Sequence, residues 1–310
     1  MVGKVDATLW YVVGVGQYLK YTKDKKFLEE FSKSIEKAMN YLFSLELNGK
    51  GFLYIPTGGD WADEYITHGY VLFDEILYFQ ALKEYELILK KTNKPYKEIS
   101  KKRKNLQEMI VVNFFPEYKK RNSKRVYNKE LYLKILKKFN YPYAMSYFSS
   151  DGFSKRLDCF ANSLLLLSDI SKRKYKERVI SHLGDKLDKQ KIKILPAFWP
   201  PINSRSSFWK ILKMNSLFSF RNKPHYYHNG GLWPLIQGFF IASLAKEKKK
   251  KRAKEFLDEF SKTLTQGKYI FNEYYDSKKY KPRGIRRMGF SAAGYILAYT
   301  STIENKRIFL

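Results

Sequence analysis

Helical segments of two kinds alternate along the chain, and this alternation restricts the fold more than any other feature. Segments of the first kind are apolar on nearly all sides and cover residues 6–22, 70–89, 157–170, 231–245 and 289–302. Segments of the second kind carry apolar residues at three- and four-residue steps and cover residues 25–45, 96–115, 173–190 and 251–266. A helix that is apolar all round is buried on all sides, whereas an amphipathic helix covers a core from outside. The pattern predicts an all-α fold with an inner and an outer ring of helices, an α/α toroid, as a single domain over residues 1–310.

The same pattern supports two further predictions. Residues 128–139 are a possible additional amphipathic helix, and residues 51–56 and 268–276 read as short strands in connecting loops. In a toroid the inner helices begin at one common end of the ring. We therefore expect five helix starts at that end, near Ala7, Ile66, Leu157, Leu232 and Phe290.

The chain is strongly basic. Lysine and arginine number 59 against 30 aspartates and glutamates, which gives a formal net charge of +29. Such a charge attracts nucleic acids. The lysines are scattered, however, and the dense runs at 101–105 and 246–255 fall at helix-like or turn-like positions. This distribution favours a solvated lysine-rich surface over a nucleic-acid site, and we expect no nucleic-acid partner.

Several classes of protein are disfavoured by what the sequence lacks. Cys159 is the only cysteine, so no internal disulfide can form, and no cysteine pair has the spacing of a zinc site. No apolar run approaches the about 20 residues that a membrane span needs. The first ten residues do not have the layout of a signal peptide. We therefore expect a cytoplasmic protein without metal, cofactor or membrane partner.

Polar and aromatic residues gather just before each predicted inner helix. The densest group, at residues 225–234, reads HYYHNGGLWP. Asn229 as a helix cap and Pro234 in the first helical turn would explain part of it. The histidines, tyrosines and tryptophan have polar tips on apolar rings, which suit a wall that is half apolar and half wet. We expect these residues to line the mouth of a central funnel, as loops on a rigid scaffold often carry a binding site.

A cleft of rings and carboxylates suggests glycoside hydrolysis, which uses one carboxylic acid and one carboxylate. Eight acidic residues stand before predicted inner helices: Asp6, Asp60, Asp63, Glu64, Asp151, Asp158, Glu273 and Asp276. The residue types alone do not choose a pair among them, because most carboxylates at such positions cap helices or form ion pairs.

Several motifs resemble the (α/α)6-barrel glycoside hydrolases. These motifs are VDATLWYVVGVGQYLKYTKD, GGDWADEYITHGYVL, YHNGGLWP, FNEYYD with KPRG, and GFSAAGYILAY. The group includes neutral invertases, processing α-glucosidases, mannosylglycerate hydrolases and the amylo-α-1,6-glucosidase domain of glycogen-debranching proteins. The resemblance runs from about Val5 to about Tyr299, and a segment resembling another loop of the group reads LPAFWPPI.

The resemblance implies an inverting mechanism with Asp63 as general acid and Glu273 as general base, and Asp60 is the rival for the acid. Trp61 and Tyr65 could form an apolar wall that raises a carboxyl pKa, as a general acid requires. The two carboxyl groups should then lie about 6.5–9.5 Å apart.

Structural roles compete with each of these assignments. Asp60 and Asp63 could simply cap a helix that begins near Ile66. Glu273 could form an ion pair with one of three nearby arginines, Arg283, Arg286 or Arg287.

The resemblance also implies residues that bind the sugar, by stacking on its faces or by hydrogen bonding to its hydroxyls. The candidates are Asp6, Trp10, Asp60, Trp61, Asp158, Trp199, Tyr227, His228, Asn229 and Trp233. The alternative roles are a place in the core for the tryptophans, and capping or loop fixing for His228 and Asn229.

The expected function is hydrolysis of an α-glucosidic bond, either in an α-glucan, as in glycogen debranching, or in a small glycoside such as sucrose. The alternative is a non-catalytic carbohydrate-binding or accessory protein. A full toroid of this group has more helix pairs than the sequence shows, so we expect the first hairpin to be absent. An open ring would expose apolar flanks, which suggests a homodimer or an N-terminal partner segment.

Overall fold

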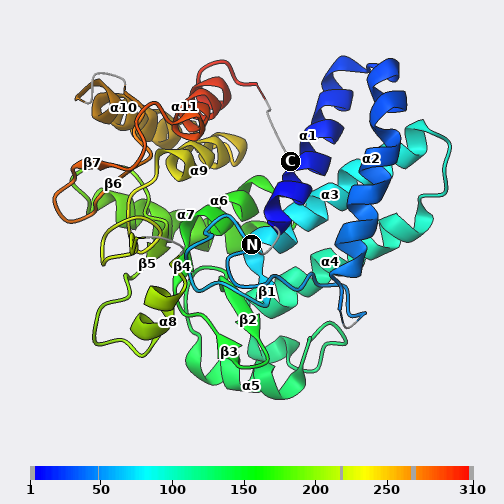
Figure 1. Cartoon of the computed structure of the whole chain (residues 1–310), viewed down its shortest axis with the longest axis horizontal. Helices are drawn as coiled ribbons and strands as arrows, with labels where there is room; N and C mark the ends of the chain where they lie inside the picture. Colours follow the sequence, from blue (N-terminus) through cyan, green and yellow to red (C-terminus); the bar gives the residue numbers. More distant parts are fainter. Residues whose placement is uncertain (1–3, 48, 217–218, 267–269, 307–310) are drawn as a thin grey trace. The chain divides into compact units, whose positions relative to one another are not determined.

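The computed structural model describes residues 4–47, 49–216, 219–266 and 270–306, which form eleven α-helices and short strands (Figure 1). The chain divides into two compact units. The first comprises Met1–Asp63, Thr67–Asn140 and Met145–Lys155. The second comprises Glu64–Ile66, Tyr141–Ala144 and Arg156–Leu310. The prediction of one toroidal domain over the whole chain stays a prediction.

The first unit is built from two helical hairpins and a small sheet. Its helices are α1 (Val5–Thr22), α2 (Lys25–Ser44), α3 (Leu72–Lys91), α4 (Lys97–Phe114), the 3-10 helix η1 (Tyr118–Lys120) and α5 (Lys129–Lys138). Its antiparallel strands are β1 (Tyr70–Val71), β2 (Tyr147–Ser149) and β3 (Gly152–Phe153), in that order in the sheet. α3 packs against both α1 and α4, and α1 packs against α2. The helix predicted at 128–139 is confirmed as α5.

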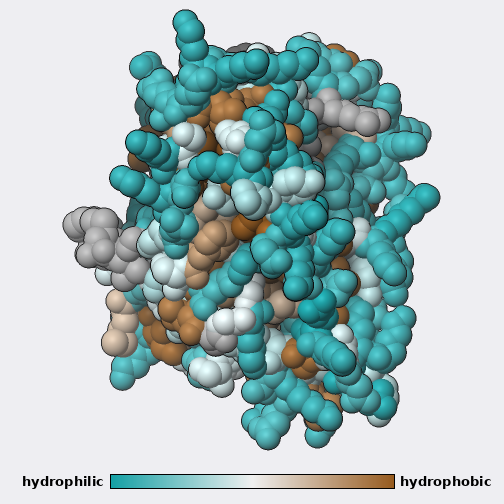
Figure 2. Space-filling model, turned by 90° about the vertical axis from the view of Figure 1, so that its right-hand side faces the viewer, coloured by the Kyte–Doolittle hydropathy of each residue, from teal (hydrophilic) through white to brown (hydrophobic). Residues whose placement is uncertain are grey.

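Burial separates α3 from α2 as the sequence predicts, but the prediction of burial on nearly all sides is wrong for α1, where Ala7, Gly14, Tyr18 and Tyr21 are exposed. α3 buries residues on every side, from Leu72 to Leu89. α2 buries only Ile35, Met39 and Leu42, and its N-terminus is capped by Asp24, whose Oδ1 accepts from the Phe27 N–H at 3.0 Å. Figure 2 views the molecule from the side on which α2 lies in Figure 1, and this face is covered mostly by hydrophilic side chains.

The predicted start of the second inner helix, near Ile66, is wrong. α3 begins at Leu72. Gly69 has a φ of +80° and forms a bridge with Ile55, and Tyr70–Val71 then pair with Tyr147–Phe148 as strand β1. The backbone hydrogen bonds that a helix would use are thus made by strand pairing up to residue 71.

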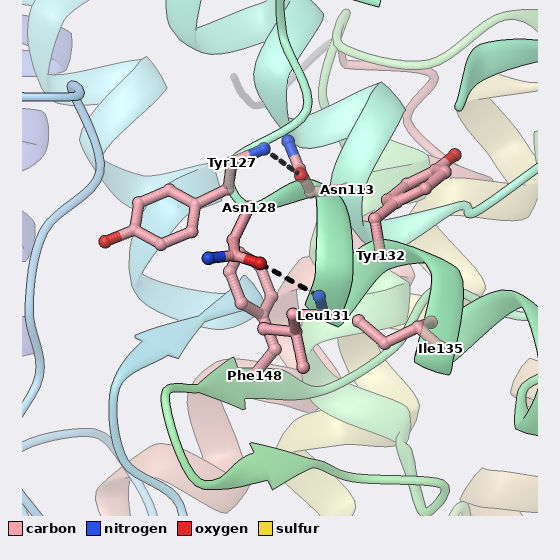
Figure 3. A pocket seen from close by; sticks show the side chains of 7 residues that line it. All are labelled: Asn113, Tyr127, Asn128, Leu131, Tyr132, Ile135 and Phe148. Carbon is pink, nitrogen blue, oxygen red and sulfur yellow. Dashed lines mark hydrogen bonds between the residues drawn. The ribbon is translucent and has the colours of Figure 1, made fainter. Parts of the chain in front are cut away.

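A pocket beside α5 is filled by its own side chains (Figure 3). The Oδ1 of Asn113 accepts from the Tyr127 N–H at 2.8 Å, and the Oδ1 of Asn128 caps α5 by accepting from the Leu131 N–H at 2.9 Å. None of the predicted site residues lines this pocket.

The second unit contains the remaining helices and two short two-stranded sheets. Its helices are α6 (Cys159–Leu167), α7 (Arg173–Asp188), α8 (Phe208–Met214), α9 (Pro234–Lys246), α10 (Lys250–Gln266) and α11 (Gly289–Thr302). Strands β4 (Leu157–Asp158) and β5 (Phe198–Trp199) form one sheet, and β6 (Tyr274–Tyr275) and β7 (Pro282–Arg283) form the other. Of the strand predicted at 268–276, residues 274–275 are found, while 267–269 lie outside the described residues.

α9 is the central helix of the second unit. It packs against α6, α10 and α11. Every residue of α6 is buried, and α9 is buried from Ile236 to Leu244. α11 is buried on one face only, and Phe290 and Ile296 on its other face are more than half exposed. The prediction of burial on all sides is therefore confirmed for α6 and α9 and is wrong for α11.

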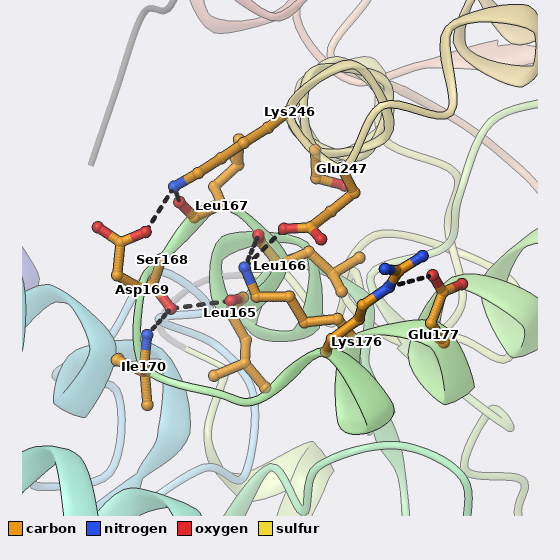
Figure 4. A network of polar contacts seen from close by, with 12 residues as sticks. Leu165, Leu166, Leu167, Ser168, Asp169, Ile170, Lys176, Glu177, Lys246 and Glu247 are labelled. Carbon is orange, nitrogen blue, oxygen red and sulfur yellow. Dashed lines mark hydrogen bonds and ion pairs between the residues drawn. The ribbon is translucent and has the colours of Figure 1, made fainter.

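Two lysines hold the C-terminus of α6 (Figure 4). The Nζ of Lys176 donates to the Leu166 carbonyl at 3.1 Å and pairs with Glu247 at 2.6 Å. The Nζ of Lys246 donates to the Leu167 carbonyl and pairs with Asp169 at 3.2 Å. Cations at a helix C-terminus satisfy its last carbonyls and complement the helix dipole.

Candidate active site

Backbone hydrogen bonds join the segments that precede the inner helices of the second unit. β4 runs directly into α6 and pairs with β5, with Leu157 opposite Trp199. The stretch just before α9 pairs on both sides. The Ala197 N–H donates to the Gly231 carbonyl at 2.8 Å, and Leu232 and Tyr275 exchange hydrogen bonds of 2.8 and 2.9 Å. The segments that lead into α6 and α9 and the β6 strand therefore lie together, as the sequence predicts for the mouth of a funnel.

Glu273 lies at this place and is held by backbone. Its N–H donates to the Ile285 carbonyl at 2.9 Å, and its Oε2 accepts from the Ile285 N–H at 3.0 Å. Its side chain is 5% exposed. Gly284 has a φ of +72°, and a Cβ at this residue would lie 2.1 Å from the Glu273 Oε2. A residue with a side chain at position 284 would therefore collide with the carboxylate.

The alternative role predicted for Glu273 is an ion pair with a nearby arginine. Arg283 does not form it. The Nε of Arg283 lies 3.3 Å from Asp276 Oδ2 instead. Among the described residues, no ion pair joins Glu273 to Arg286 or Arg287 either. The Oε1 of Glu273 makes no hydrogen bond within the described part of the chain, so this oxygen remains available to a ligand or to water.

Four aromatic rings form a cluster beside Glu273. Trp233 stacks with His228, with ring centroids 5.3 Å apart, and with Tyr274, at 5.8 Å. Tyr227 packs on His228 at 4.0 Å and accepts a hydrogen bond at its carbonyl from the Trp233 Nε1–H at 3.1 Å. All four side chains are buried. Burial raises the pKa of Tyr274, and the neighbouring Glu273 carboxylate raises it further.

Two polar candidates in this unit have structural partners. Asp158 is the N-cap of α6 and accepts from the Ala161 N–H at 2.9 Å. Asn229 does not cap α9, since Trp233 occupies that position. Both amide hydrogens of Asn229 go to carbonyls, of Ile202 at 2.8 Å and of Asn222 at 3.0 Å, and its Oδ1 accepts from the Ile202 N–H at 2.6 Å.

Trp199 is the one predicted tryptophan of this unit that is partly exposed. The Nζ of Lys186 lies 3.3 Å from the centre of its ring, and the His225 ring lies 6.0 Å away. Burial lowers the pKa of Lys186 to about 8. A lysine over a tryptophan face is a favourable cation–π contact.

The second unit also contains a short piece of the segment predicted to hold the acid. The carboxylate of the buried Glu64 pairs with Arg221, and the Asn222 Nδ2–H donates to the Glu64 carbonyl at 2.7 Å. The Tyr65 ring stacks on Phe198 with centroids 4.1 Å apart. Residues 64–66 are thus fixed to the segments at 198 and 221–222.

In the first unit, Asp63 lies in a small group of charges. The Nζ of Lys4 lies 3.1 Å from Asp63 Oδ2, and both side chains are about one-third exposed, at 37% and 35%. Burial raises the pKa of the nearby Asp6, an effect that the Lys4 ammonium opposes and the Asp63 carboxylate reinforces. Asp60 is buried, and its Oδ1 accepts from the Ala62 N–H at 3.1 Å. The alternative role, capping of a helix near Ile66, is wrong for both because no helix begins there.

Trp10 and Trp61 both lie near the ring of one core residue, Phe73. The Trp10 and Phe73 ring centroids are 6.4 Å apart, and those of Trp61 and Phe73 are 6.1 Å apart. Both tryptophans are partly exposed. They therefore keep ring surface that a sugar could contact, whereas Trp233 is buried.

The predicted site residues fall into two groups, and each group is gathered within its own unit. The first unit holds Asp6, Trp10, Asp60, Trp61 and Asp63, and the second holds Asp158, Trp199, Tyr227, His228, Asn229, Trp233 and Glu273. Sequence reasoning missed Lys4, Arg221 and Tyr274. Lys4 and Arg221 stand within a few residues of a motif and Tyr274 lies inside one, but only their position in the sequence could have suggested them. No cluster of metal-ligating side chains occurs among the described residues.

Comparison with known proteins places the chain in a family. The family model of the alkaline and neutral invertases matches residues 1–303. The chain belongs to this family. It is therefore a glycoside hydrolase of the invertase family, and of the groups that the motifs resemble, the neutral invertases are the one that the match supports. A search of curated proteins found no match to the sequence.

Solved structures show the fold of this invertase-family protein. A mannosylglycerate hydrolase of glycoside hydrolase family 63 from Thermus thermophilus, in complex with glucose, matches with a TM-score of 0.63 and 12% identity over 93% of this chain and 74% of that one. A cellobiose 2-epimerase from Bacillus thermoamylovorans matches with a TM-score of 0.53 and 10% identity over 96% and 72%. At such identities the matches show the fold alone, and the predicted (α/α)6 glycosidase fold is confirmed.

Proposed function

We propose that this invertase-family protein hydrolyses sucrose with inversion, using Asp63 as general acid and Glu273 as general base. The family match over residues 1–303 carries the proposal, because an invertase is an enzyme that cleaves sucrose. In such a reaction the acid protonates the oxygen of the leaving sugar. The base takes a proton from water, whose oxygen attacks the anomeric carbon from the opposite face.

The surroundings of Glu273 suit a general base. Its Oε2 is fixed by the Ile285 N–H, while Oε1 makes no hydrogen bond in the described part of the chain and is left to accept a proton from water. The small exposure of the side chain excludes most bulk water. A base that is fixed in place loses no orientation during the reaction, which favours catalysis.

The surroundings of Asp63 support a role in the reaction, and a second carboxyl group, that of Asp6, lies nearby. It is partly exposed and does not cap a helix, so its carboxyl group is accessible. Asp6 beside it has a pKa that burial raises, so two carboxyl groups with different surroundings lie at this place. We further propose that Trp10, Trp61 and Trp199 contact the sugars, and that Asp60, Asp158, Tyr227, His228, Asn229 and Trp233 shape the site around them.

The test measures sugar release from sucrose, trehalose, maltooligosaccharides, glycogen and mannosylglycerate. We expect release from sucrose, with the β-anomer of glucose formed first, as proton NMR would show. Asp63→Asn and Glu273→Gln should each lower kcat by about 10²- to 10⁴-fold and leave the fold intact. Asp60→Asn, in which the rival acid is changed, should lower kcat much less than Asp63→Asn does.

Other outcomes would contradict the proposal in distinct ways. Release from glycogen but not from sucrose would indicate a debranching enzyme. Binding of sugars without turnover would indicate an accessory protein. Wild-type rates in both Asp63→Asn and Glu273→Gln would show that the mechanism is wrong even though the fold is right.

A further inference from the structure

Arg221 makes an arrangement of contacts that a simple surface ion pair does not need. Its Nε lies 3.2 Å from one oxygen of Glu64, and its Nη2 pairs with the other oxygen. The guanidinium also lies over the Tyr227 ring, with Cζ 4.1 Å from the ring centre. Glu64 is 2% exposed, whereas the Arg221 side chain is 42% exposed. A buried carboxylate therefore fixes the orientation of a guanidinium that faces solvent.

The contacts use only part of the guanidinium. Nε and Nη2 are engaged by Glu64, and within the described part of the chain Nη1 makes no hydrogen bond. A planar guanidinium held along one edge presents its remaining N–H groups in a fixed direction. These donors are suited to a hydroxyl oxygen of a sugar, because they cannot turn away.

Arg221 also belongs to the electrostatic surroundings of the proposed base. The hydrogen bond to Glu64 raises the pKa of Arg221, with further contributions from Tyr227 and from the carboxylate of Glu273. The charge of Arg221 likewise acts on Tyr274, the residue that follows Glu273. Its ring partner, Tyr227, is part of the aromatic cluster beside the base and has a φ of +45°.

We propose that Arg221 is a substrate-positioning residue, which Glu64 holds so that its Nη1 donates a hydrogen bond to a hydroxyl of the sugar bound at Glu273. The inference rests on the proposed function and adds a specificity-determining pair, Glu64 and Arg221, to it. The substrate that fits this geometry is a sugar. When the sugar is bound at Glu273, one of its hydroxyl groups lies within hydrogen-bonding distance of the Arg221 Nη1.

The decisive variant is Arg221→Lys. A lysine keeps the positive charge opposite Glu64, but a single ammonium cannot hold both carboxylate oxygens and also present a fixed donor to the sugar. We expect kcat/KM for sucrose to fall by about 10- to 100-fold, the size of one lost charged hydrogen bond. The change should lie mainly in KM, because the contact is made before as well as during the reaction.

Arg252→Gln is the matched control. Arg252 also pairs with acidic residues, Asp188 and Glu255, lies over a ring, with Cζ 4.3 Å from the centre of Phe256, and is 38% exposed. It is on α10, and its partners include none of the predicted site residues. Arg221→Gln should lower the unfolding temperature more than Arg252→Gln, because it leaves the buried Glu64 carboxylate unpaired whereas Asp188 and Glu255 are exposed, and only Arg221→Gln should lose activity.

Glu64→Gln is the second variant in case Arg221→Gln does not fold. It removes the negative charge that fixes Arg221. The KM for sucrose should therefore rise, as in Arg221→Lys. Glu273→Gln is assayed in parallel to separate the two proposals. If Glu273→Gln is inactive but Arg221→Lys and Glu64→Gln keep kcat/KM within about twofold of wild type, the role of Arg221 is refuted and the proposed function stands. If Glu273→Gln is as active as wild type, the proposed function fails and this inference fails with it.

Discussion

At the scale of single residues, the proposed base is fixed by backbone and not by an opposite charge. Sequence reasoning offers three arginines as partners of Glu273, since all stand within 14 positions of it. In the structure, Arg283 pairs with Asp276, and the Ile285 N–H binds Glu273. A single glycine allows this arrangement, because any side chain at position 284 would collide with the carboxylate.

Gly284→Ala tests how much the position of Glu273 matters. The added Cβ would lie 2.1 Å from Oε2 and must displace the carboxylate or the loop. A displacement of about 1 Å can cost about 100-fold in rate, and we expect a loss of this size in kcat for sucrose. Gly49→Ala is the control, because Gly49 also has a positive φ, of +64°, but no atoms lie within 4 Å of the added Cβ. Similar activities of the two variants would contradict the prediction.

At the scale of secondary-structure elements, the closest packing in the second unit is between α9 and α11. A Cβ at Gly238 would lie 2.0 Å from the Gly294 carbonyl oxygen, and a Cβ at Gly294 would lie 2.8 Å from the Leu235 Cα. The two backbones therefore meet at glycines. α11 leads away from the loop that holds Glu273, so this contact fixes the helix that follows the proposed base.

Gly238→Ala should destabilise the protein, because the methyl group has no space between the two helices. Overpacking of this kind costs typically about 1–3 kcal/mol, and we expect about 2–3 kcal/mol from denaturant unfolding. Gly184→Ala is the control in the same unit, since Gly184 lies within α7 and its added Cβ meets no atom within 4 Å. That variant should gain about 0.5–1 kcal/mol from the better helix propensity of alanine. A loss in both variants, or in neither, would show that the α9–α11 contact is not tight.

At the scale of the whole molecule, this strongly basic chain also contains buried carboxyl groups. The net charge is +29, yet three carboxyl groups of the first unit, those of Asp6, Glu75 and Glu84, have raised pKa values, in each case mainly because of burial. Glu75 is fully buried on α3, and its Oε1 accepts from the Leu53 N–H at 2.8 Å.

A search of the described residues for membrane spans found no helix with the length and hydropathy that a span needs.

The raised pKa of Glu75 predicts a loss of stability at higher pH. Above the ordinary value of 4.5 the unfolded chain has released this proton, while the native protein keeps it. The native state therefore binds more protons, and the free energy of unfolding falls as pH rises toward the native pKa. In Glu75→Gln this contribution is absent, so the variant should become more stable relative to wild type as pH is raised from 4.5 to about 8.

The measured quantity is the difference between the two unfolding curves at each pH. His182 and His225 have lowered pKa values, mainly because of burial, and add an opposite slope near pH 6.5, but they are common to both proteins. Parallel stability curves for Glu75→Gln and wild type would show that Glu75 titrates alike in the folded and unfolded chains.

The sequence by itself determined the class of fold and the places where polar groups gather. Apolar and amphipathic periodicity identified the helices. A helix buried on one side has apolar residues at three- and four-residue steps, and a helix buried on all sides is apolar throughout. The periodicity misplaced the start of α3, because only pairing with β2, which is distant in sequence, makes Tyr70–Val71 a strand. It also overstated the burial of α11. How much of a helix is buried depends on how many other elements pack against it, and the residue spacing does not give that number.

Only the tertiary structure decided what each polar residue does. Asn229 occurs in a motif as distinctive in sequence as that of Glu273, and Asp158 is, like Glu273, an acidic residue before a predicted inner helix, yet both are hydrogen-bonded to backbone groups. Glu64 and Arg221 are 157 residues apart, and nothing in either segment indicates the other. Hydrogen bonds act over a few ångströms and are set by which segments the fold brings together, so a one-dimensional pattern can propose such residues but cannot pair them.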